Sequence, residues 1–146
     1  MSRDYHLLLD TKDTIEELRK TLTTSCGVKA TDDGWFVSDA VNLQLEPVRP
    51  SDVNLTEPAI PKATYIIDFV PNSHAENRVY KIFRMAVTLM QKHPGDAALA
   101  AQDATTAMLR LDGVVYLDPA QTLFDRVTDD DFPSTAVVHR MPGVQA

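Results

Sequence analysis

The stretch from residue 92 to residue 118, KHPGDAALAAQDATTAMLRLDGVVYLD, constrains the fold more than any other part of the chain. Its HPGD sequence at 93–96 is typical of a helix end, because proline cannot continue a helix and glycine adopts the conformation that terminates one. Asp112-Gly113 is a strong signal for a two-residue turn between antiparallel strands. The apolar runs expected to form strands are 97–102, 107–111 and 114–117. The stretch therefore predicts a helix followed by a three-stranded β-meander.

Two amphipathic helices are predicted before this meander. The first is expected over residues 12–25, where Thr14 and Glu17 have the spacing of a capping box. Its inward stripe, at helical spacing, is Ile15, Leu18, Leu22 and Cys26. The second helix follows Pro71-Asn72-Ser73, and its inward stripe is Val79, Ile82, Phe83, Ala86, Val87 and Met90. An apolar stripe on one side predicts that each helix packs that side against a sheet.

The remaining apolar segments have the pattern of β-strands. Residues 40–48 alternate between apolar and polar side chains, as in a half-buried antiparallel strand. The other predicted strands are 5–9, 63–70, and a hairpin of 28–30 with 35–37 around the turn Asp32-Asp33-Gly34. The predicted order is β-α-β-β-β-β-α-β-β-β. This order predicts an α+β fold, with a single mainly antiparallel β-sheet and two main helices packed on one face.

Two segments leave alternatives open. Residues 49–62 are proline-rich and are predicted as an irregular loop, which is either a functional, mobile element or a simple surface crossover. After residue 119 the pattern weakens, and the tail is either an added edge strand at 136–139 or poorly ordered. The length of 146 residues suits one domain, so residues 1–146 are expected to form a single α+β domain.

The charge balance limits the classes of partner. The chain has a formal net charge of -7, whereas a nucleic-acid-binding protein needs a basic face to neutralise phosphates. The balance is compatible with a basic protein partner, because complementary charge accelerates encounter. The simpler interpretation is that net acidity keeps the protein in solution. The sequence shows no signal peptide and no apolar stretch of membrane-spanning length, so a cytoplasmic location without a membrane partner is expected.

Few side chains are candidates for chemistry. The four histidines, His6, His74, His93 and His139, do not have metal-ligand spacing, and the chain has one cysteine, so no metal site is predicted. Asp129-Asp130-Asp131 lacks the spacing of a calcium loop, and no glycine-rich phosphate loop occurs, so no cofactor is expected. His93 at a helix end is assigned a structural role, and Cys26 is assigned to the buried stripe. No catalytic residue is predicted.

Three loop acids and one aromatic residue are the candidates for partner binding. Asp32, Asp33 and Glu57 fall in turns or loops, where a partner could contact them. Trp35 is a candidate anchor because tryptophan contributes strongly to many interfaces, although a place in the core is the alternative for the same residue. A scattered solubilising surface is the simpler interpretation for most of the exposed acids.

Several segments match the pattern of one known family in order along the chain. They are DYHLLL at 4–9, the strand at 63–70, PGDAAL at 94–99 after the long apolar helix, and MLRLDGVVYLD at 108–118. In these segments the chain resembles the swarming-inhibition (Sit-type) immunity proteins of bacterial polymorphic toxin systems, which counter contact-delivered toxins. Residues 49–62 and the tail after 119 do not match. The resemblance implies a protein without catalytic residues that neutralises a cognate toxin stoichiometrically inside the producing cell.

The first functional hypothesis is therefore a cytoplasmic, non-enzymatic immunity protein, monomeric or homodimeric, whose acidic loops complement a basic toxin such as a nuclease. A second hypothesis is a small α+β enzyme that uses Cys26 or a histidine, and it predicts a solvent-reachable thiol with a depressed pKa. A third hypothesis is a structural or regulatory subunit that dimerises through an exposed strand edge. The sequence does not identify the toxin.

Overall fold

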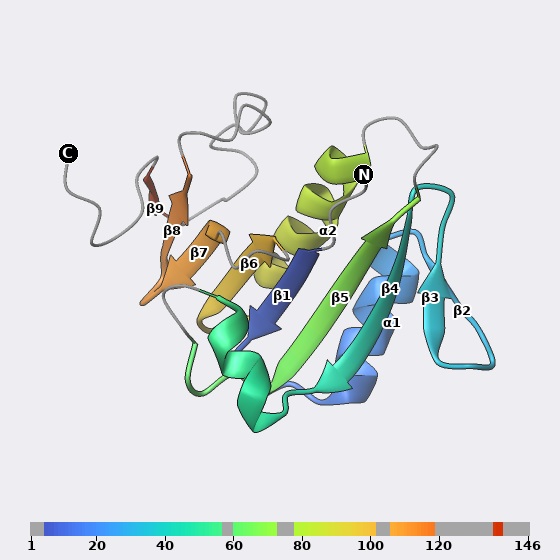
Figure 1. The fold of residues 1–146 in the computed structure, drawn as a ribbon, viewed down its shortest axis with the longest axis horizontal. Coiled ribbons are helices and arrows are strands. Elements are labelled where there is room, and N and C mark those ends of the chain that lie inside the picture. Colours follow the sequence, from blue (N-terminus) through green and yellow to red (C-terminus); the bar gives the residue numbers. More distant parts are fainter. Residues whose placement is uncertain (1–4, 57–59, 73–77, 102–105, 119–135, 139–146) are drawn as a thin grey trace.

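Nine strands form one sheet in the computed structural model, which describes residues 5–56, 60–72, 78–101, 106–118 and 136–138. The strand order across the sheet is β2-β3-β4-β5-β1-β6-β7-β8-β9 (Figure 1). The strands are β1 (Tyr5–Leu9), β2 (Lys29–Ala30), β3 (Trp35–Val37), β4 (Val41–Pro47), β5 (Tyr65–Pro71), β6 (Ala97–Ala101), β7 (Thr106–Leu111), β8 (Val114–Leu117) and β9 (Ala136–Val138). The predicted α+β fold is confirmed, and the ten predicted strands and helices occur in the predicted order, with a short 3-10 helix (Pro50–Leu55) between β4 and β5.

The first strand lies in the middle of the sheet. Strand β1 pairs antiparallel with β5 on one side and with β6 on the other (Figure 1). Only the pairing of β9 with β8 is parallel, so the sheet is mainly antiparallel, as predicted. Of the two alternatives for the tail, the added strand is the one found at Ala136–Val138. The rest of the tail lies outside the described residues.

Helix α1 (Ile15–Ser25) begins where the capping box predicts. The Thr14 side chain accepts a hydrogen bond from the Glu17 N–H, and the Glu17 carboxylate accepts one from the Thr14 N–H. The helix therefore begins three residues later than the predicted residue 12. The amide of Thr11 instead donates to the Thr64 hydroxyl, which ties the preceding segment to the start of β5.

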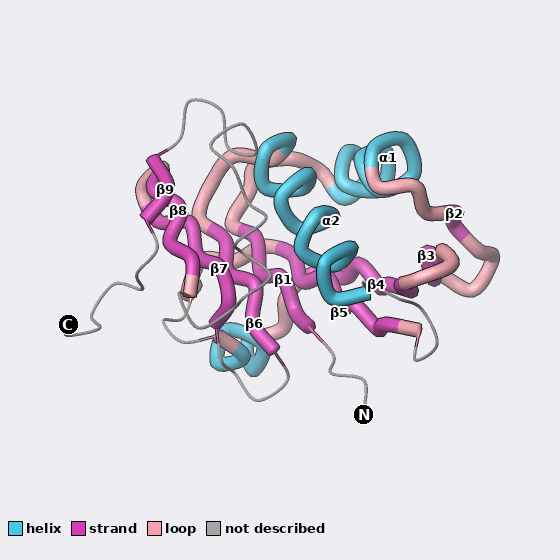
Figure 2. The backbone as a smooth tube through the Cα atoms, turned by 90° about the horizontal axis from the view of Figure 1, so that it is seen from above, coloured by secondary structure: helices cyan, strands magenta, loops and turns pink. Residues whose placement is uncertain are grey.

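Helix α2 (Arg78–Lys92) ends immediately before the HPGD sequence. Both helices lie on the same side of the sheet, as predicted (Figure 2). Their inward residues join the sheet side chains of that side in the main core, which includes Leu18, Leu22, Ile82, Phe83, Ala86, Leu7, Leu43, Ile67 and Phe69. The apolar stripes read from the sequence are therefore the packing faces of the two helices.

A shorter element covers part of the opposite side of the sheet. Residues Pro50–Leu55 form a 3-10 helix, η1, which lies across the sheet from α1 and α2 (Figure 2). Beyond η1, Ile60 is buried in a second apolar cluster with Leu8, Ile66 and Leu109 from the sheet. The segment predicted as an irregular loop thus includes a helical turn, and its apolar residues cover the sheet.

Candidate functional site

The turn between β2 and β3 presents two carboxylates to solvent. Asp32 and Asp33 are both exposed, and residues around them fix the turn. Gly34 donates its N–H to the Thr31 carbonyl with an N–O distance of 3.2 Å, and Thr31 donates its own N–H to the Trp35 carbonyl at 2.8 Å. Hydrogen bonds from the Thr31 hydroxyl and then from the Trp35 N–H lower the pKa of Asp33. Asp33 therefore remains ionised at neutral pH.

Trp35 is half-buried, so the sequence alternative that placed it in the core is wrong. The alternation of the short strand gives the core position to its neighbour Phe36, which is 4% exposed. Trp35 instead lies beside an open cavity. An indole that is partly covered and partly open to solvent has the features of an interface anchor.

A cavity of about 520 Å³ lies between α1 and the β2–β3 hairpin, and we call it the hairpin groove. It is lined by Glu16, Arg19, Lys20 and Thr23 of α1, by Ala30, Thr31, Asp32, Gly34, Trp35 and Phe36 of the hairpin, and by Leu45 of β4. Its apolar residues come from the strands, and most of its charged residues come from the helix. This combination of an aromatic centre and a charged rim is typical of protein-binding surfaces.

Two of the four predicted contact residues line the hairpin groove, and a third adjoins them. Asp32 and Trp35 line it, and Asp33 is the next residue of the turn. Glu57 lies outside the described residues. The contribution of α1 was not predicted, because residues such as Arg19 and Lys20 have the pattern of an ordinary solvated helix face.

Some charged residues at the hairpin groove form an ion pair with each other, and others do not. Arg19 donates to the Glu16 carboxylate at 2.7 Å, so these two charges offset each other. Among the described residues, Asp32 and Asp33 form no ion pair. The groove is therefore lined by one carboxylate that forms no ion pair among the described residues, that of Asp32. The Asp33 carboxylate is next to it in the turn, and the Lys20 ammonium lies on the helix wall of the groove.

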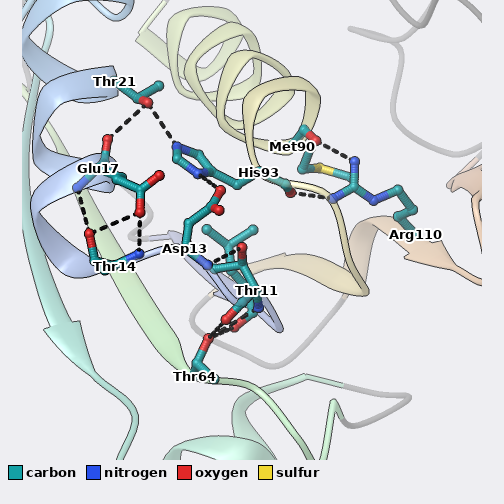
Figure 3. A network of polar contacts seen from close by, with 10 residues as sticks. Thr11, Asp13, Thr14, Glu17, Thr21, Thr64, Met90, His93 and Arg110 are labelled. Atoms are coloured by element: carbon teal, nitrogen blue, oxygen red, sulfur yellow. Dashed lines mark hydrogen bonds and ion pairs between the residues drawn. The ribbon is translucent and has the colours of Figure 1, made fainter.

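A second group of polar residues is buried where the two helices meet (Figure 3). The ring of His93, which is 3% exposed, hydrogen-bonds through Nδ1 to the Asp13 carboxylate at 2.6 Å and through Nε2 to the Thr21 hydroxyl at 2.8 Å. Asp13 precedes α1 and Thr21 lies on it, whereas His93 follows α2. The imidazole therefore joins the two helices, and the structural role predicted for His93 is confirmed.

The same three groups have the order of a hydrolase triad, but their surroundings do not fit one. The Thr21 hydroxyl also donates to the Glu17 carbonyl of its own helix at 3.1 Å, so its single hydrogen is already bonded within the helix. Thr21 is only 9% exposed. Neither Thr21 nor His93 lines the hairpin groove or the two cavities described below. The Thr21 hydroxyl therefore does not open into any of these three cavities.

The HPGD sequence has a structural role at each residue after the proline. Gly95 has a φ of +132° and lies against the Asp10 backbone, and a Cβ there would be 1.8 Å from the Asp10 carbonyl oxygen. The Asp96 carbonyl accepts the Asp10 N–H at 2.8 Å, and its carboxylate accepts the Asp112 N–H at 3.1 Å. This segment therefore helps to close the fold by contacts with Asp10 and Asp112.

Arg110 of β7 caps the end of α2 (Figure 3). Its guanidinium donates to the carbonyl of Gly95 at 2.6 Å, to that of His93 at 2.8 Å and to that of Met90. Burial lowers the pKa of Arg110, and the nearby Asp96 carboxylate opposes this effect. A cation at a helix C-terminus satisfies carbonyls that have no partner within the helix. Arg110 also lines a cavity of about 580 Å³ together with Lys92, Asp96 and Asp112.

Cys26 lies at a third cavity, of about 460 Å³, rather than fully inside the core. It is half-buried at the end of α1, and Lys81 and Arg84 of α2 line the same cavity. Burial raises the pKa of the Cys26 thiol to about 11. A nucleophilic cysteine needs a lowered pKa, because the thiolate is the reactive form. The raised pKa of the Cys26 thiol therefore disfavours the hypothesis of an enzyme that uses this thiol.

We expect native Cys26 to react with iodoacetamide at pH 8 about a hundredfold more slowly than in the urea-unfolded chain. The reason is the rise of its pKa from the ordinary 9.0 to about 11, which reduces the thiolate fraction. Mass spectrometry of timed samples measures the reaction at the single cysteine of the chain. Equal rates in the native and unfolded chains would restore the cysteine as a candidate nucleophile.

The other histidines contribute no further site among the described residues. The Nδ1 atom of His6 hydrogen-bonds to the Asp68 carboxylate across the β1–β5 pair. In the described part of the chain, no three histidine, cysteine, aspartate or glutamate side chains are grouped so that they could hold a metal ion. His74, His139 and Asp129-Asp130-Asp131 lie outside the described residues.

Comparisons of the chain with protein-family models, with curated proteins and with solved structures gave no match. None of the helices described here has the length and apolar character needed to cross a membrane.

Proposed function

We propose that this protein is an immunity protein, which binds a cognate bacterial toxin in the cytoplasm and neutralises it without a reaction of its own. The observation that carries the proposal is the hairpin groove. It combines a half-buried tryptophan with the Asp32 carboxylate, and the exposed Asp33 carboxylate adjoins it in the turn. Neither carboxylate has a cationic partner among the described residues. Such a surface fits the binding of a basic protein.

The roles of the buried polar residues agree with this proposal. His93 and Arg110, the described residues most easily mistaken for catalytic groups, hydrogen-bond to other parts of the fold. The Cys26 thiol has a raised pKa. A net charge of -7 favours encounter with a toxin of opposite charge, such as a nuclease that must itself bind phosphates.

Co-expression with the protein encoded by the adjacent upstream gene tests the proposal. We expect that this neighbour alone stops growth of the host, and that co-expression of the present chain restores it. We also expect the two purified proteins to elute as one complex of defined stoichiometry, measured by size-exclusion chromatography with light scattering. Absence of both the complex and the protection would refute the proposal. The Gly95→Ala variant, which is expected to misfold because a Cβ would clash with the Asp10 carbonyl, is the negative control in the growth assay.

A further inference from the structure

The hairpin groove differs in charge from the other two described cavities. The cavity at Cys26 is lined by Lys81 and Arg84 and by one acid, Asp39, and none of its lining residues is aromatic. In the cavity beside Arg110, the guanidinium binds three carbonyls, and the Asp96 carboxylate accepts a backbone N–H. Of the three, only the hairpin groove combines an aromatic lining residue with a carboxylate, that of Asp32, that forms no ion pair among the described residues.

The Asp33 carboxylate, which adjoins the hairpin groove, is held in place before any partner binds. Asp33 accepts hydrogen bonds from the Thr31 hydroxyl and from the Trp35 N–H, which fixes the turn relative to the indole. Asp32 is exposed beside it and lines the groove. A preformed arrangement loses little conformational freedom on binding, so its contacts contribute more to affinity.

An arginine side chain fits this arrangement of charge and aromatic surface. A guanidinium forms bidentate hydrogen bonds with carboxylates and also stacks on the face of an indole. The groove offers both kinds of contact within four consecutive residues, Asp32 to Trp35. A lysine ammonium would pair with the carboxylates but would form a weaker contact with the ring.

We infer that the hairpin groove is the toxin-binding surface, and that it receives an arginine-bearing segment of the toxin with its guanidinium between the Asp32 carboxylate and the Trp35 indole. This inference rests on the proposed function and adds the surface and the partner chemistry to it. The apolar residues Phe36 and Leu45 line the same groove and contact the aliphatic part of the segment.

The single tryptophan of the chain provides a direct probe of the groove. Protein labelled with 5-fluorotryptophan has one ¹⁹F resonance, from position 35, and an unlabelled toxin adds no signal. We expect this resonance to shift or broaden when the product of the adjacent gene is added. An unchanged resonance under conditions where a complex forms would place the toxin on another surface.

Two matched charge reversals test the contribution of the turn. Asp32 and Asp39 are both exposed, and they lie near opposite ends of β3. We expect Asp32→Lys to slow association with the toxin about tenfold at low salt, with a smaller effect at high salt, because steering by charge is screened by ions. Asp39→Lys makes the same change in net charge and should leave the rate close to that of the wild type. Equal effects of the two variants would indicate a general charge effect and overturn the inference.

Substitutions at position 35 test the anchor. We expect Trp35→Ala to weaken the complex at least about thirtyfold, as for other buried interface tryptophans, and Trp35→Phe to have a smaller effect. The phenylalanine variant keeps an aromatic ring, so it separates loss of binding from loss of folding.

A charge swap across the interface tests the partner chemistry. Each arginine of the toxin is replaced in turn by aspartate, and one of these toxin variants should regain affinity for the Asp32→Arg variant of the present chain. If the toxin binds but none of these variants alters affinity, the inference fails and the proposed function stands. If the wild-type chain does not bind the toxin, both fail.

Discussion

Replacing Gly95 with alanine is expected to lower the free energy of unfolding by about 4 kcal/mol, enough to leave much of the protein misfolded. A Cβ at this position would lie 1.8 Å from the Asp10 carbonyl oxygen, and the φ of +132° is itself unfavourable for an alanine. The Asp10 backbone cannot move away freely, because its N–H bonds to the Asp96 carbonyl. Urea unfolding followed by circular dichroism measures the loss.

Gly113→Ala is the matched control for this substitution. Gly113 also has a positive φ, +82°, but a Cβ there would meet nothing within 4 Å. The expected cost is about 1 kcal/mol, which is the conformational penalty without a steric clash. If the two variants lose equal stability, the close approach between Gly95 and Asp10 does not constrain the fold.

The Arg110→Met variant is expected to lose about 3 kcal/mol of unfolding free energy. Methionine fills a similar volume but leaves the carbonyls of Met90, His93 and Gly95 without their shared donor. Arg110→Lys keeps the charge near the helix end, although an ammonium cannot reach three carbonyls in the geometry of a guanidinium, so an intermediate loss is expected. Thermal unfolding by calorimetry ranks the three proteins.

Arg19→Met serves as the comparison on the surface of α1. Arg19 is exposed and pairs with Glu16 one turn away, so its replacement should cost less than about 0.5 kcal/mol. A small effect of Arg110→Met, similar to that of Arg19→Met, would show that the last turn of α2 does not need the guanidinium.

The main strands and helices of this fold could be predicted from local sequence because they carry local signals, whereas the 3-10 helix at Pro50–Leu55 was predicted as an irregular loop. The alternation in residues 40–48 gives β4, and the Thr14–Glu17 pair gives the first turn of α1. Asp112-Gly113 gives the hairpin between β7 and β8. Each of these patterns involves residues no more than a few positions apart, so no knowledge of the tertiary structure is needed to read it.

The contacts that close the fold could not be predicted in this way. The pair of His93 with Asp13 spans 80 residues, and Arg110 reaches back 20 residues to Met90. The parallel pairing of β9 with β8 also joins segments whose relative position is set by the rest of the chain. Charged and polar residues at such positions have the same local pattern as exposed ones, so the sequence does not show which of them are buried.

The candidate site was partly predictable for the same reason. Asp32, Asp33 and Trp35 are neighbours in the chain, and their proximity follows from the hairpin turn. The opposite wall of the hairpin groove comes from α1, and its position beside the hairpin depends on how the helix packs. The sequence therefore identified one wall of the surface, and the structure supplied the other.

The central position of β1 has a consequence for how the chain acquires its structure during synthesis. Leu7, Leu8 and Leu9 are synthesised before both neighbours of their strand, which lie at least 55 positions later, in β5 and β6. These leucines cannot pair with β5 until residues 65–71 have been made, or with β6 until residues 97–101 have been made. Folding dominated by such distant pairings is slow and exposes apolar segments to aggregation. The nascent chain is therefore expected to depend on a chaperone that shields its first strand.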